Sequence, residues 1–377
     1  MTAAAVTTQP STAVSPQGVD EPAVPLATAA RLNPPRTLIV TAGGDILTES
    51  VVRNAAQEAG TESGSRYDFT PMFSGLQSAT ANADLAICHM ELPIGGPTQA
   101  PGSYGRSPFG GNLVLSPFEL AAGVRAAGFD RCSTASNHSF DLGPGGITTT
   151  LEALDASGIS HVGTARNPWE SLPVVFEVSG VNVGHISYTR WSNTVRPAES
   201  WRLNYATSTT QIANDVAALR NAGAEIILVS LHLSRELQQG PTSIDRAFTT
   251  QLTAVAEIDL VVHHGPHVVQ PIELVNDTLV YWSLGNMVSG MGVAGRGPYE
   301  DPRTLDGLMA TVRFLETTSG KWMAQPYTTA TCTDPRTRLV RAGRSALDDP
   351  NANLGLETWA ALAQCVWRTE SVVGPTG

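Results

Sequence analysis

Short apolar runs alternate with longer amphipathic segments along the chain from residue 37 onwards. Apolar runs bounded by turn residues predict buried strands, and the amphipathic segments between them predict helices that cover a sheet. This order is typical of βαβ units and predicts an α/β fold. The strands predicted in this way are residues 38–42, 83–88, 131–135, 159–163, 183–188, 226–231, 260–263, 279–283 and 308–314.

Capping and stop residues mark the helices between these strands. Ser116 precedes Pro117, and Glu119 lies three residues after Ser116, which is a capping-box arrangement with proline at the first helical position. Gly128 then provides a stop signal. The other predicted helices are residues 144–157, about 209–222, about 243–257 and about 354–366.

The same pattern divides the chain into three parts. Residues 1–35 are rich in Ala, Thr, Pro and Ser and have few large apolar side chains, so we expect a disordered tail. Residues 36–315 hold the regular alternation and form the predicted domain, with long Pro/Gly-rich loops at 93–111 and 290–302. The alternation is lost in residues 316–377, which we expect to pack on the domain as a small C-terminal extension.

Composition and charge narrow the range of partners. Hydrophobic residues make up 42% of the chain, which is ample for a core. The net charge of -11 argues against binding a phosphate backbone, so we expect no nucleic-acid partner. The sequence holds neither an apolar run of about 20 residues, which would span a bilayer, nor a basic region followed by an apolar one, which would mark a secretory leader.

The four cysteines fall into two pairs with different expectations. Cys88 and Cys132 lie in apolar, strand-like stretches, where we expect buried free thiols. Cys332 and Cys365 lie in the C-terminal segment, and a disulfide between them would stabilise the fold by roughly 3–4 kcal/mol in an oxidising compartment. Sequence does not show whether their Cα atoms approach, so this pairing stays open.

Polar, metal-competent residues follow five of the apolar stretches where the chain leaves a strand for a loop. Open α/β sheets place their sites at such points. Six of the eight histidines fall in these segments, and we assign the remaining two, His161 and His185, to structural roles. This coincidence favours one shared site. The segments are residues 43–45, 89–91, 136–141, 230–232 and 263–267.

The residue types in these segments indicate metal chemistry. Carboxylate oxygen, amide oxygen and neutral imidazole together suit Zn²⁺, Mn²⁺ or Fe. Two such ions bridged by one carboxylate would clamp an oxyanion and lower the pKa of a bound water. A nearby histidine that binds no metal would protonate the leaving group.

Several longer motifs carry a resemblance to a known family. They include Ala-Gly-Phe-Asp at 127–130, Ser-Asn-His-Ser-Phe-Asp-Leu-Gly at 136–143, Val-Ser-Leu-His at 229–232, Asp-Leu-Val-Val-His-His-Gly-Pro-His at 259–267 and Tyr-Trp-Ser-Leu-Gly-Asn at 281–286. In this order they resemble bacterial capsule-synthesis proteins of the CapA type, which are divergent relatives of the calcineurin-like metallophosphoesterases. The resemblance implies a four-layer αββα sandwich of the calcineurin-like metallophosphoesterase type, with one or two divalent ions (Mn, Zn or Fe).

The resemblance also implies a role for individual residues. His138 would be the acid or the oxyanion partner, and Asp141 would orient it. Asn286 would line the pocket, and Arg106 would contact an anionic group of the substrate. The metal ligands implied are Asp45, Glu91, Asn137, His232, His264 and His267.

Departures from the family pattern leave some ligands open. Leu47 stands where the wider superfamily has a metal-binding histidine. His89 stands where the family usually has asparagine, and it would either replace the missing nitrogen ligand or bond to backbone at the strand end. His263 stands where a glycine is usual, so either His263 or His264 is the ligand.

The function implied is capsule or poly-γ-glutamate biosynthesis beside a capsule-synthesis ligase and a membrane component. The metal site favours a hydrolase acting on a phosphoester or an amide of an anionic polymer or small-molecule substrate. Two alternatives remain: a non-catalytic polymer assembly or export partner with a degenerate metal site, and a soluble enzyme recruited to a specialised pathway. The resemblance implies an extracellular or cell-surface location, whereas the missing leader and anchor would suit a cytoplasmic one.

Overall fold

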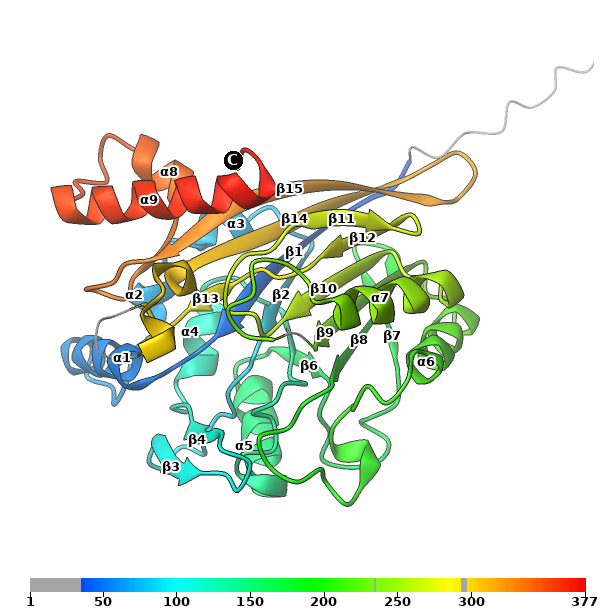
Figure 1. Ribbon diagram of the computed structural model, residues 1–377, viewed down its shortest axis with the longest axis horizontal. Coiled ribbons are helices and arrows are strands. Elements are labelled where there is room, and N and C mark those ends of the chain that lie inside the picture. The colour runs from blue at the N-terminus through cyan, green and yellow to red at the C-terminus, as the bar shows by residue number, and fades with distance from the viewer. Residues whose placement is uncertain (1–34, 234, 293–296) are drawn as a thin grey trace, which may run out of the picture. The chain divides into compact units, whose positions relative to one another are not determined.

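The computed structural model describes residues 35–233, 235–292 and 297–377. The disordered tail expected for residues 1–35 lies outside the described residues except for Pro35. The described chain forms two mixed sheets with helices on their outer faces, and a separate two-stranded hairpin (Figure 1). None of its helices combines the length and apolarity needed to cross a bilayer.

The larger sheet has eight strands in the order β16-β15-β14-β1-β2-β5-β6, and β13 also pairs with β1. Its β1, β2, β5 and β6 run parallel, while β14, β15 and β16 extend it by antiparallel pairing. Its strands are β1 (Thr37–Ile46), β2 (Leu85–His89), β5 (Arg131–Ser133), β6 (Ser160–Val162), β13 (Asn286–Val288), β14 (Asp306–Glu316), β15 (Trp322–Thr333) and β16 (Val340–Ala342).

The smaller sheet has six strands in the order β11-β12-β10-β9-β8-β7, with a parallel centre of β8, β9, β10 and β12. The hairpin pairs β3 (Gly102–Arg106) with β4 (Asn112–Leu115). The strands of the smaller sheet are β7 (Val175–Val178), β8 (Val181–Thr189), β9 (Ile226–His232), β10 (Leu260–His264), β11 (Ile272–Val275) and β12 (Thr278–Tyr281).

Helices cover the outer faces of both sheets. Figure 1 shows α6 and α7, in green, beside the smaller sheet, and α1 and α4, in blue and cyan, beside the larger one. The α-helices are α1 (Ser50–Ser63), α2 (Thr70–Phe73), α3 (Gln77–Thr80), α4 (Leu120–Ala126), α5 (Gly143–Ala156), α6 (Thr209–Asn221), α7 (Ser243–Val255), α8 (Gly343–Asp348) and α9 (Leu356–Val373). Short 3₁₀ helices are η1 (Ser200–Arg202), η2 (Gly297–Glu300) and η3 (Pro302–Leu305).

Three apolar clusters fill the spaces between the layers. The central cluster joins the two sheets, for example Val40 of β1 with Val262 of β10. One outer cluster packs the larger sheet against α1, α4 and α5, and the other packs the smaller sheet against α6 and α7, as with Leu252 and Val261. Each fully buried side chain of this size contributes roughly 1.5–3 kcal/mol. These clusters confirm the four-layer αββα sandwich.

The beginning of α4 differs from the prediction. The helix starts at Leu120, and Ser116 does not cap it, because the Ser116 hydroxyl is bonded to the Thr48 hydroxyl at 2.7 Å. That bond ties the loop after β4 to the loop after β1 and removes the side chain from the helix end. Gly128 has a φ of 96° and ends the helix as predicted.

The C-terminal segment is more closely joined to the sandwich than we expected. Residues 316–377 supply β15 and β16 to the larger sheet, and α9 packs on β15 and β14. The alternation in the sequence is weak there because much of β15 is only partly buried. Cys332 and Cys365 join β15 to α9 as a disulfide, with Cα atoms 6.1 Å apart, which settles the pairing that the sequence left open.

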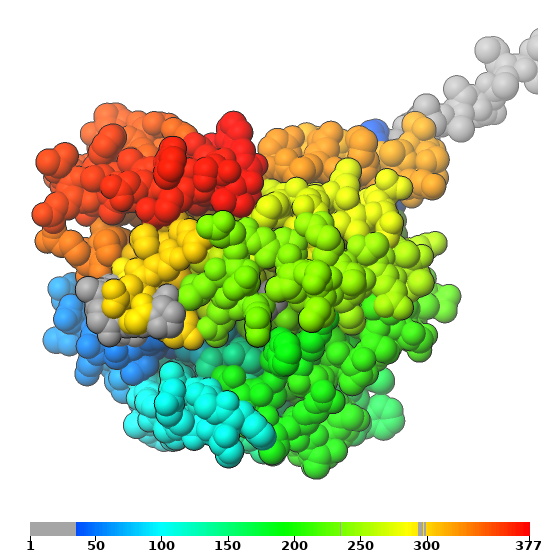
Figure 2. All heavy atoms as spheres, in the orientation of Figure 1, coloured from blue at the N-terminus to red at the C-terminus, as the bar shows by residue number. Residues whose placement is uncertain are grey.

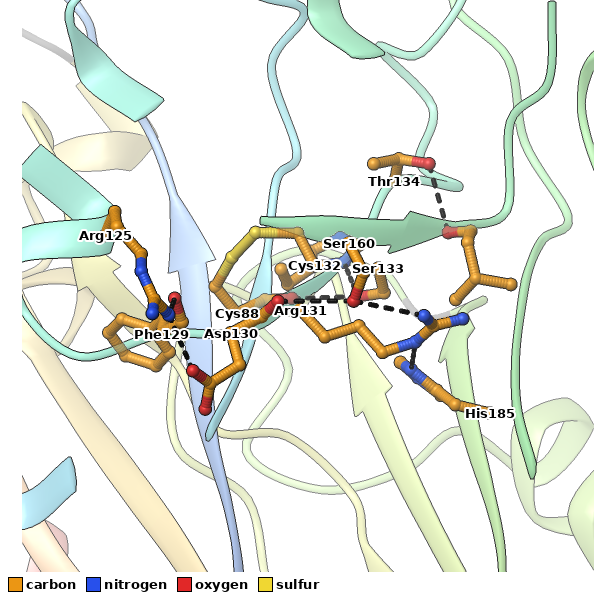
Figure 3. Close-up of a disulfide and its surroundings, with 12 residues drawn as sticks. Cys88, Arg125, Phe129, Asp130, Arg131, Cys132, Ser133, Thr134, Ser160 and His185 are labelled. Atoms are coloured by element: carbon orange, nitrogen blue, oxygen red, sulfur yellow. Dashed lines mark hydrogen bonds and ion pairs between the residues drawn. A yellow bond between two sulfur atoms is a disulfide. The ribbon is translucent and has the colours of Figure 1, made fainter. Parts of the chain in front are cut away.

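The expectation of free thiols at Cys88 and Cys132 is wrong. These residues lie directly opposite each other on the parallel neighbours β2 and β5, with Cα atoms 4.5 Å apart, and they form a disulfide (Figure 3). The register of two strands from different parts of the chain decides this pairing, and the local sequence does not contain it. In the same view Arg131 lies beside His185, whose Nδ1 accepts from the guanidinium at 3.1 Å.

Candidate metal centre

Strand pairing brings metal-competent side chains from both sheets to one edge. In the larger sheet, Asp45 at the end of β1 lies opposite His89 of β2 and Asn286 of β13. In the smaller sheet, His264 at the end of β10 lies opposite His232 of β9. Such strand ends are where open α/β sheets place ligand sites. The two sheets therefore contribute side chains to one shared site.

Asp45 is fully buried and lies at the centre of this site. Its Oδ1 lies 3.0 Å from Nδ1 of His264, and its Oδ2 accepts the Gly265 N–H at 3.0 Å and lies 3.3 Å from Nδ1 of His267. Burial raises the pKa of the Asp45 carboxyl, but hydrogen bonds from His264 and His267 outweigh it and hold the pKa well below its usual value. Asp45 is therefore an anionic group at neutral pH.

Two glycines let the backbone pass close to the site. A Cβ at Gly44 would overlap the carbonyl oxygen of Gly285, so glycine is required where β1 meets the loop before β13. Gly265 has a φ of 100°, and a Cβ there would lie 3.0 Å from Nε2 of His232. Side chains at either position would push the strand ends and the His232 ring apart.

His267 lies between two carboxylates. Its Nε2 is 3.6 Å from Oε1 of Glu91, and its Nδ1 is 3.3 Å from Oδ2 of Asp45. The same Nδ1 lies 3.0 Å from the amide Oδ1 of Asn286. The His267 backbone has a φ of 59°, a region that costs a non-glycine residue about 1–3 kcal/mol and that these contacts hold in place. Burial lowers the pKa of His267, but the charges of Glu91 and Asp45 raise it to about 10. The two carboxylates therefore favour a positive charge at the position between them.

Unpartnered oxygen atoms of residues that line the same cavity as His267 also favour a cation there. Among the described residues, the buried Oε2 of Glu91 and the buried Oδ1 of Asn137 have no hydrogen-bond partner. Burial, followed by the nearby charge of Asp45, raises the pKa of Glu91 well above its usual value. A buried acceptor without a partner costs about 1–3 kcal/mol, which a bound cation would offset. The donor set therefore fits a metal site.

His89 lies inside the site and supplies imidazole where the family usually has an amide. Its Nδ1 is bonded to the Ser133 hydroxyl at 2.8 Å, and its Nε2 lies 3.1 Å from Nδ1 of His232. The His89 ring also stacks on His264, with centroids 3.9 Å apart. Burial lowers the pKa of His89 well below its usual value and that of His232 to about 3. Both rings are therefore neutral, the form that binds metals.

The choice between His263 and His264 follows from strand alternation. His264 faces Asp45, whereas His263 points to the opposite face of the smaller sheet. There its Nε2 is bonded to the Thr249 hydroxyl of α7 at 3.0 Å, and its ring packs on Trp282. His264 is therefore the candidate ligand of the two, and His263 packs in the outer core.

The candidate ligands are close enough to share metal ions. Their oxygen and nitrogen donors match the preferences of Zn²⁺, Mn²⁺ and Fe. Three overlapping groups have ligand atoms within 4.8 Å of one another, namely Asp45 with His89 and His264, His89 with Glu91 and His232, and Asp45 with Glu91 and His267.

A histidine–carboxylate pair lies beside these groups. The Nδ1 of His138 lies 2.7 Å from Oδ2 of Asp141, and the Val114 N–H donates to the same oxygen at 3.0 Å. Asp141 thereby holds the Nδ1 side of the His138 ring. The family resemblance implied this relationship, and the structure brings the two side chains together.

A cavity of about 270 Å³ opens onto the site. Arg106 of the hairpin lines it together with Glu91, Asn137, His138 and His267. A second cavity of about 590 Å³ adjoins the first, and Asn137 and His267 line both. Polar groups that converge on a cavity of this size are typical of small-molecule sites.

A family model described as bacterial capsule synthesis protein PGA_cap matches residues 39–291. The chain belongs to this family. The match begins in β1 and ends just after β13, so it includes every candidate metal ligand described above.

Relatives of this PGA_cap chain include proteins of two Bacillus species. The capsule biosynthesis protein CapA of Bacillus anthracis is 27% identical over 188 residues, which are 48% of this chain and 45% of that protein. The PGA biosynthesis protein CapA of Bacillus subtilis is 24% identical over 200 residues, 52% of this chain and 50% of that protein. The matches thus span about half the length of these relatives.

Similarity to solved structures is more distant. The calcineurin-like phosphoesterase YfkN from Bacillus subtilis is similar with a TM-score of 0.44 and 13% identity, covering 90% of this chain and 98% of that one. The 5'-nucleotidase precursor from Thermus thermophilus gives a TM-score of 0.43 and 14% identity, covering 88% of this chain and 59% of that one.

Several residues at the PGA_cap site were absent from the sequence prediction. Asn193, Glu236 and Tyr299 line the smaller cavity, and the Tyr299 hydroxyl donates to Glu236 at 2.6 Å. Asn193 and Glu236 lie in loops, and Tyr299 lies in the short 3₁₀ helix η2. None of them is part of a motif, so no local signal identifies them. Asn286, which we expected to line the pocket, lies behind His267 instead and donates to the Thr304 carbonyl at 2.9 Å.

Proposed function

We propose that this member of the PGA_cap family is a metal-dependent hydrolase that acts on a phosphoester or an amide of an anionic substrate in capsule or poly-γ-glutamate biosynthesis. One observation carries the proposal: buried carboxylate and imidazole groups from both sheets converge next to a cavity that also holds His138 and Arg106. The names of the Bacillus relatives support the pathway. A capsule-synthesis ligase and a membrane component are the partners proposed with it.

Each side chain has a defined task in this proposal. Divalent Mn, Zn or Fe ions held by the ligand groups would supply a Lewis acid and lower the pKa of a bound water. Asn137 would offer its free oxygen to an ion, as the unpartnered Oδ1 indicates. His138, oriented by Asp141, would hold a proton at Nε2 for the leaving group. Arg106 would pair with an anionic group of the substrate across the cavity.

The first experiment is metal analysis of the protein purified without chelator or nickel resin. We expect near-stoichiometric Zn, Mn or Fe that disappears in the double variant His264→Ala, His267→Ala. The control is His161→Ala, because His161 lies away from the site and is bonded to Asp155 at 3.1 Å. Wild-type protein that stays metal-free after reconstitution would contradict the proposed hydrolase and favour the assembly or export role.

Activity is tested next with phosphoester and γ-glutamyl amide substrates. We expect His138→Ala to keep its metal and to lose roughly 10²–10⁴-fold in turnover, because only the proton donor is removed. Metal-loaded wild type that turns over neither substrate class would contradict the proposal. Polyglutamate binding by wild type and His138→Ala alike would then favour a binding module.

A further inference from the structure

Asn193 makes two contacts with Asn137 from the loop after β8. The Asn193 backbone N–H donates to the Asn137 carbonyl at 2.8 Å, and Nδ2 of Asn137 donates to Oδ1 of Asn193 at 3.2 Å. Any residue except proline at position 193 would keep the backbone bond. Only a side chain with an acceptor at this distance would keep the second bond.

The second bond decides which end of the Asn137 amide faces the metal site. An amide has one donor end and one acceptor end, and only the oxygen binds a cation. Because the nitrogen of Asn137 is held by Asn193, the oxygen is left buried and without a partner among the described residues. We infer that Asn193, within the metal centre proposed above, is a positioning residue that presents the Asn137 oxygen to a divalent ion.

The other end of the Asn193 amide lies against the His138 ring. Its Nδ2 lies 3.1 Å from Nδ1 and 3.3 Å from Nε2 of His138. These nearly equal distances single out neither ring nitrogen as a partner. The bond between Nδ2 of Asn137 and Oδ1 of Asn193 therefore carries the orientation of the Asn137 amide.

The hairpin holds the Asn193 side chain from the opposite side. A Cβ at Gly111, in the turn between β3 and β4, would lie 2.7 Å from Cγ and 2.9 Å from Oδ1 of Asn193. Figure 2 shows the hairpin, in cyan, packed beside a green segment of the surface. Glycine at position 111 is therefore what lets the amide of Asn193 lie flat between the hairpin and Asn137.

The test measures metal affinity and does not depend on turnover. The full-length chain, stripped of metal, is titrated with Mn²⁺ by calorimetry, as wild type and as Asn137→Ala, Asn193→Ala and Asn193→Asp. We expect Asn193→Ala to raise the Kd of the same ion that Asn137→Ala affects, by roughly 10–100-fold. Asn193→Asp keeps the acceptor for Asn137 and stays close to wild type. Gly111→Ala should displace the amide of Asn193 and so weaken the binding of the same ion.

A double variant separates positioning from a general loss of structure. If Asn193 acts through Asn137, the double variant Asn137→Ala, Asn193→Ala binds Mn²⁺ no more weakly than Asn137→Ala alone. The control is Ser192→Ala in the same loop, whose hydroxyl bonds only to Thr194 among the described residues, and it keeps wild-type affinity. Thermal unfolding of every variant confirms that each is folded.

The outcomes distinguish this role from the metal centre itself. If the wild-type protein binds no Mn²⁺, both the metal centre and the role of Asn193 are contradicted. If Asn137→Ala weakens binding but Asn193→Ala does not, only the role of Asn193 falls. The role also falls if Asn193→Asp weakens binding as much as Asn193→Ala, or if the effects of Asn137→Ala and Asn193→Ala add.

Discussion

The Nδ1 atom of His264 lies 3.0 Å from Oδ1 of Asp45, although 219 residues separate them in the sequence. The contact joins the end of β10 in the smaller sheet to the end of β1 in the larger one. The preceding residue, His263, points away from it into the outer core, where it meets Thr249. Two adjacent histidines therefore have different surroundings, which allows their roles to be tested separately.

We predict opposite effects of His264→Asn and His263→Asn. The first should abolish or strongly reduce bound metal, because it removes an imidazole beside Asp45. The second should keep the metal and lower the free energy of unfolding by about 1–3 kcal/mol, because it breaks the bond to Thr249 and the packing on Trp282. Metal analysis and urea unfolding check both. Equal metal loss in the two variants would contradict the assignment.

Asn286 offers a second prediction, since it holds His267 without touching the cavity. Asn286→Ala should weaken metal binding roughly 10–100-fold, because the acceptor that fixes the His267 ring is lost. Asn286→Asp keeps an acceptor for Nδ1 of His267 and should bind metal more tightly than Asn286→Ala. Titration with Mn²⁺ measures both. Similar affinities for the two variants would exclude a role of this contact in holding the ring.

Much of the sandwich could be predicted because its buried strands are short and apolar. All nine predicted strands correspond to strands of the structure, including those that carry Asp45, His232 and His264. The edge strands β7, β11 and β16, the partly buried β15, the three-residue β13 and the hairpin were missed, because short or partly exposed strands lack a long continuous apolar run. The Cys88–Cys132 bridge was also missed, since it depends on strand register.

The site was predictable only where a residue sits in a motif. The family resemblance implied that Asp141 orients His138, and in the structure the two side chains lie 2.7 Å apart. Asn193 reaches the same ring from 55 residues away, in a loop that carries no pattern. Roles that depend on the approach of distant loops are set by tertiary packing, which a single sequence does not display.

A pH-dependent stability effect is expected at the pair of Asp306 and Arg368, which lie 2.6 Å apart at two contacts between β14 and α9. Burial raises the pKa of Asp306 to about 6, and Arg368 opposes the rise. The folded carboxyl thus keeps its proton where the unfolded one, near 3.8, has lost it. Asp306 therefore lowers stability as the pH rises from the unfolded pKa through the folded one.

Arg368→Met should enlarge this effect. It leaves the carboxylate of Asp306 unpaired, so the free energy of unfolding should fall by about 3–5 kcal/mol near neutral pH. The loss should be much smaller below the folded pKa, where Asp306 carries its proton. Urea unfolding at both pH values measures it, and the double variant Arg368→Met, Asp306→Asn should recover most of the loss. An equal loss at both pH values would contradict the argument.

The Cys332–Cys365 disulfide should contribute to stability through the loop that it closes. The two residues are 33 apart in sequence, so replacing both by alanine should lower the free energy of unfolding by roughly 3–4 kcal/mol. The control variant Cys88→Ala, Cys132→Ala keeps this loop closed, and dithiothreitol should still lower its unfolding midpoint. A control whose midpoint does not respond to dithiothreitol would argue against the contribution.

The metal centre draws its ligands from two sheets whose shared interior is mainly an apolar cluster. An ion bound there would cross-link the two sheets of the sandwich, since sliding one sheet past the other would pull Asp45 away from His264. Loading the site should therefore raise the unfolding temperature as metal concentration increases. Removing the metal would lower both the stability of the fold and the activity of the site, so a chelator would act on this protein as a denaturant.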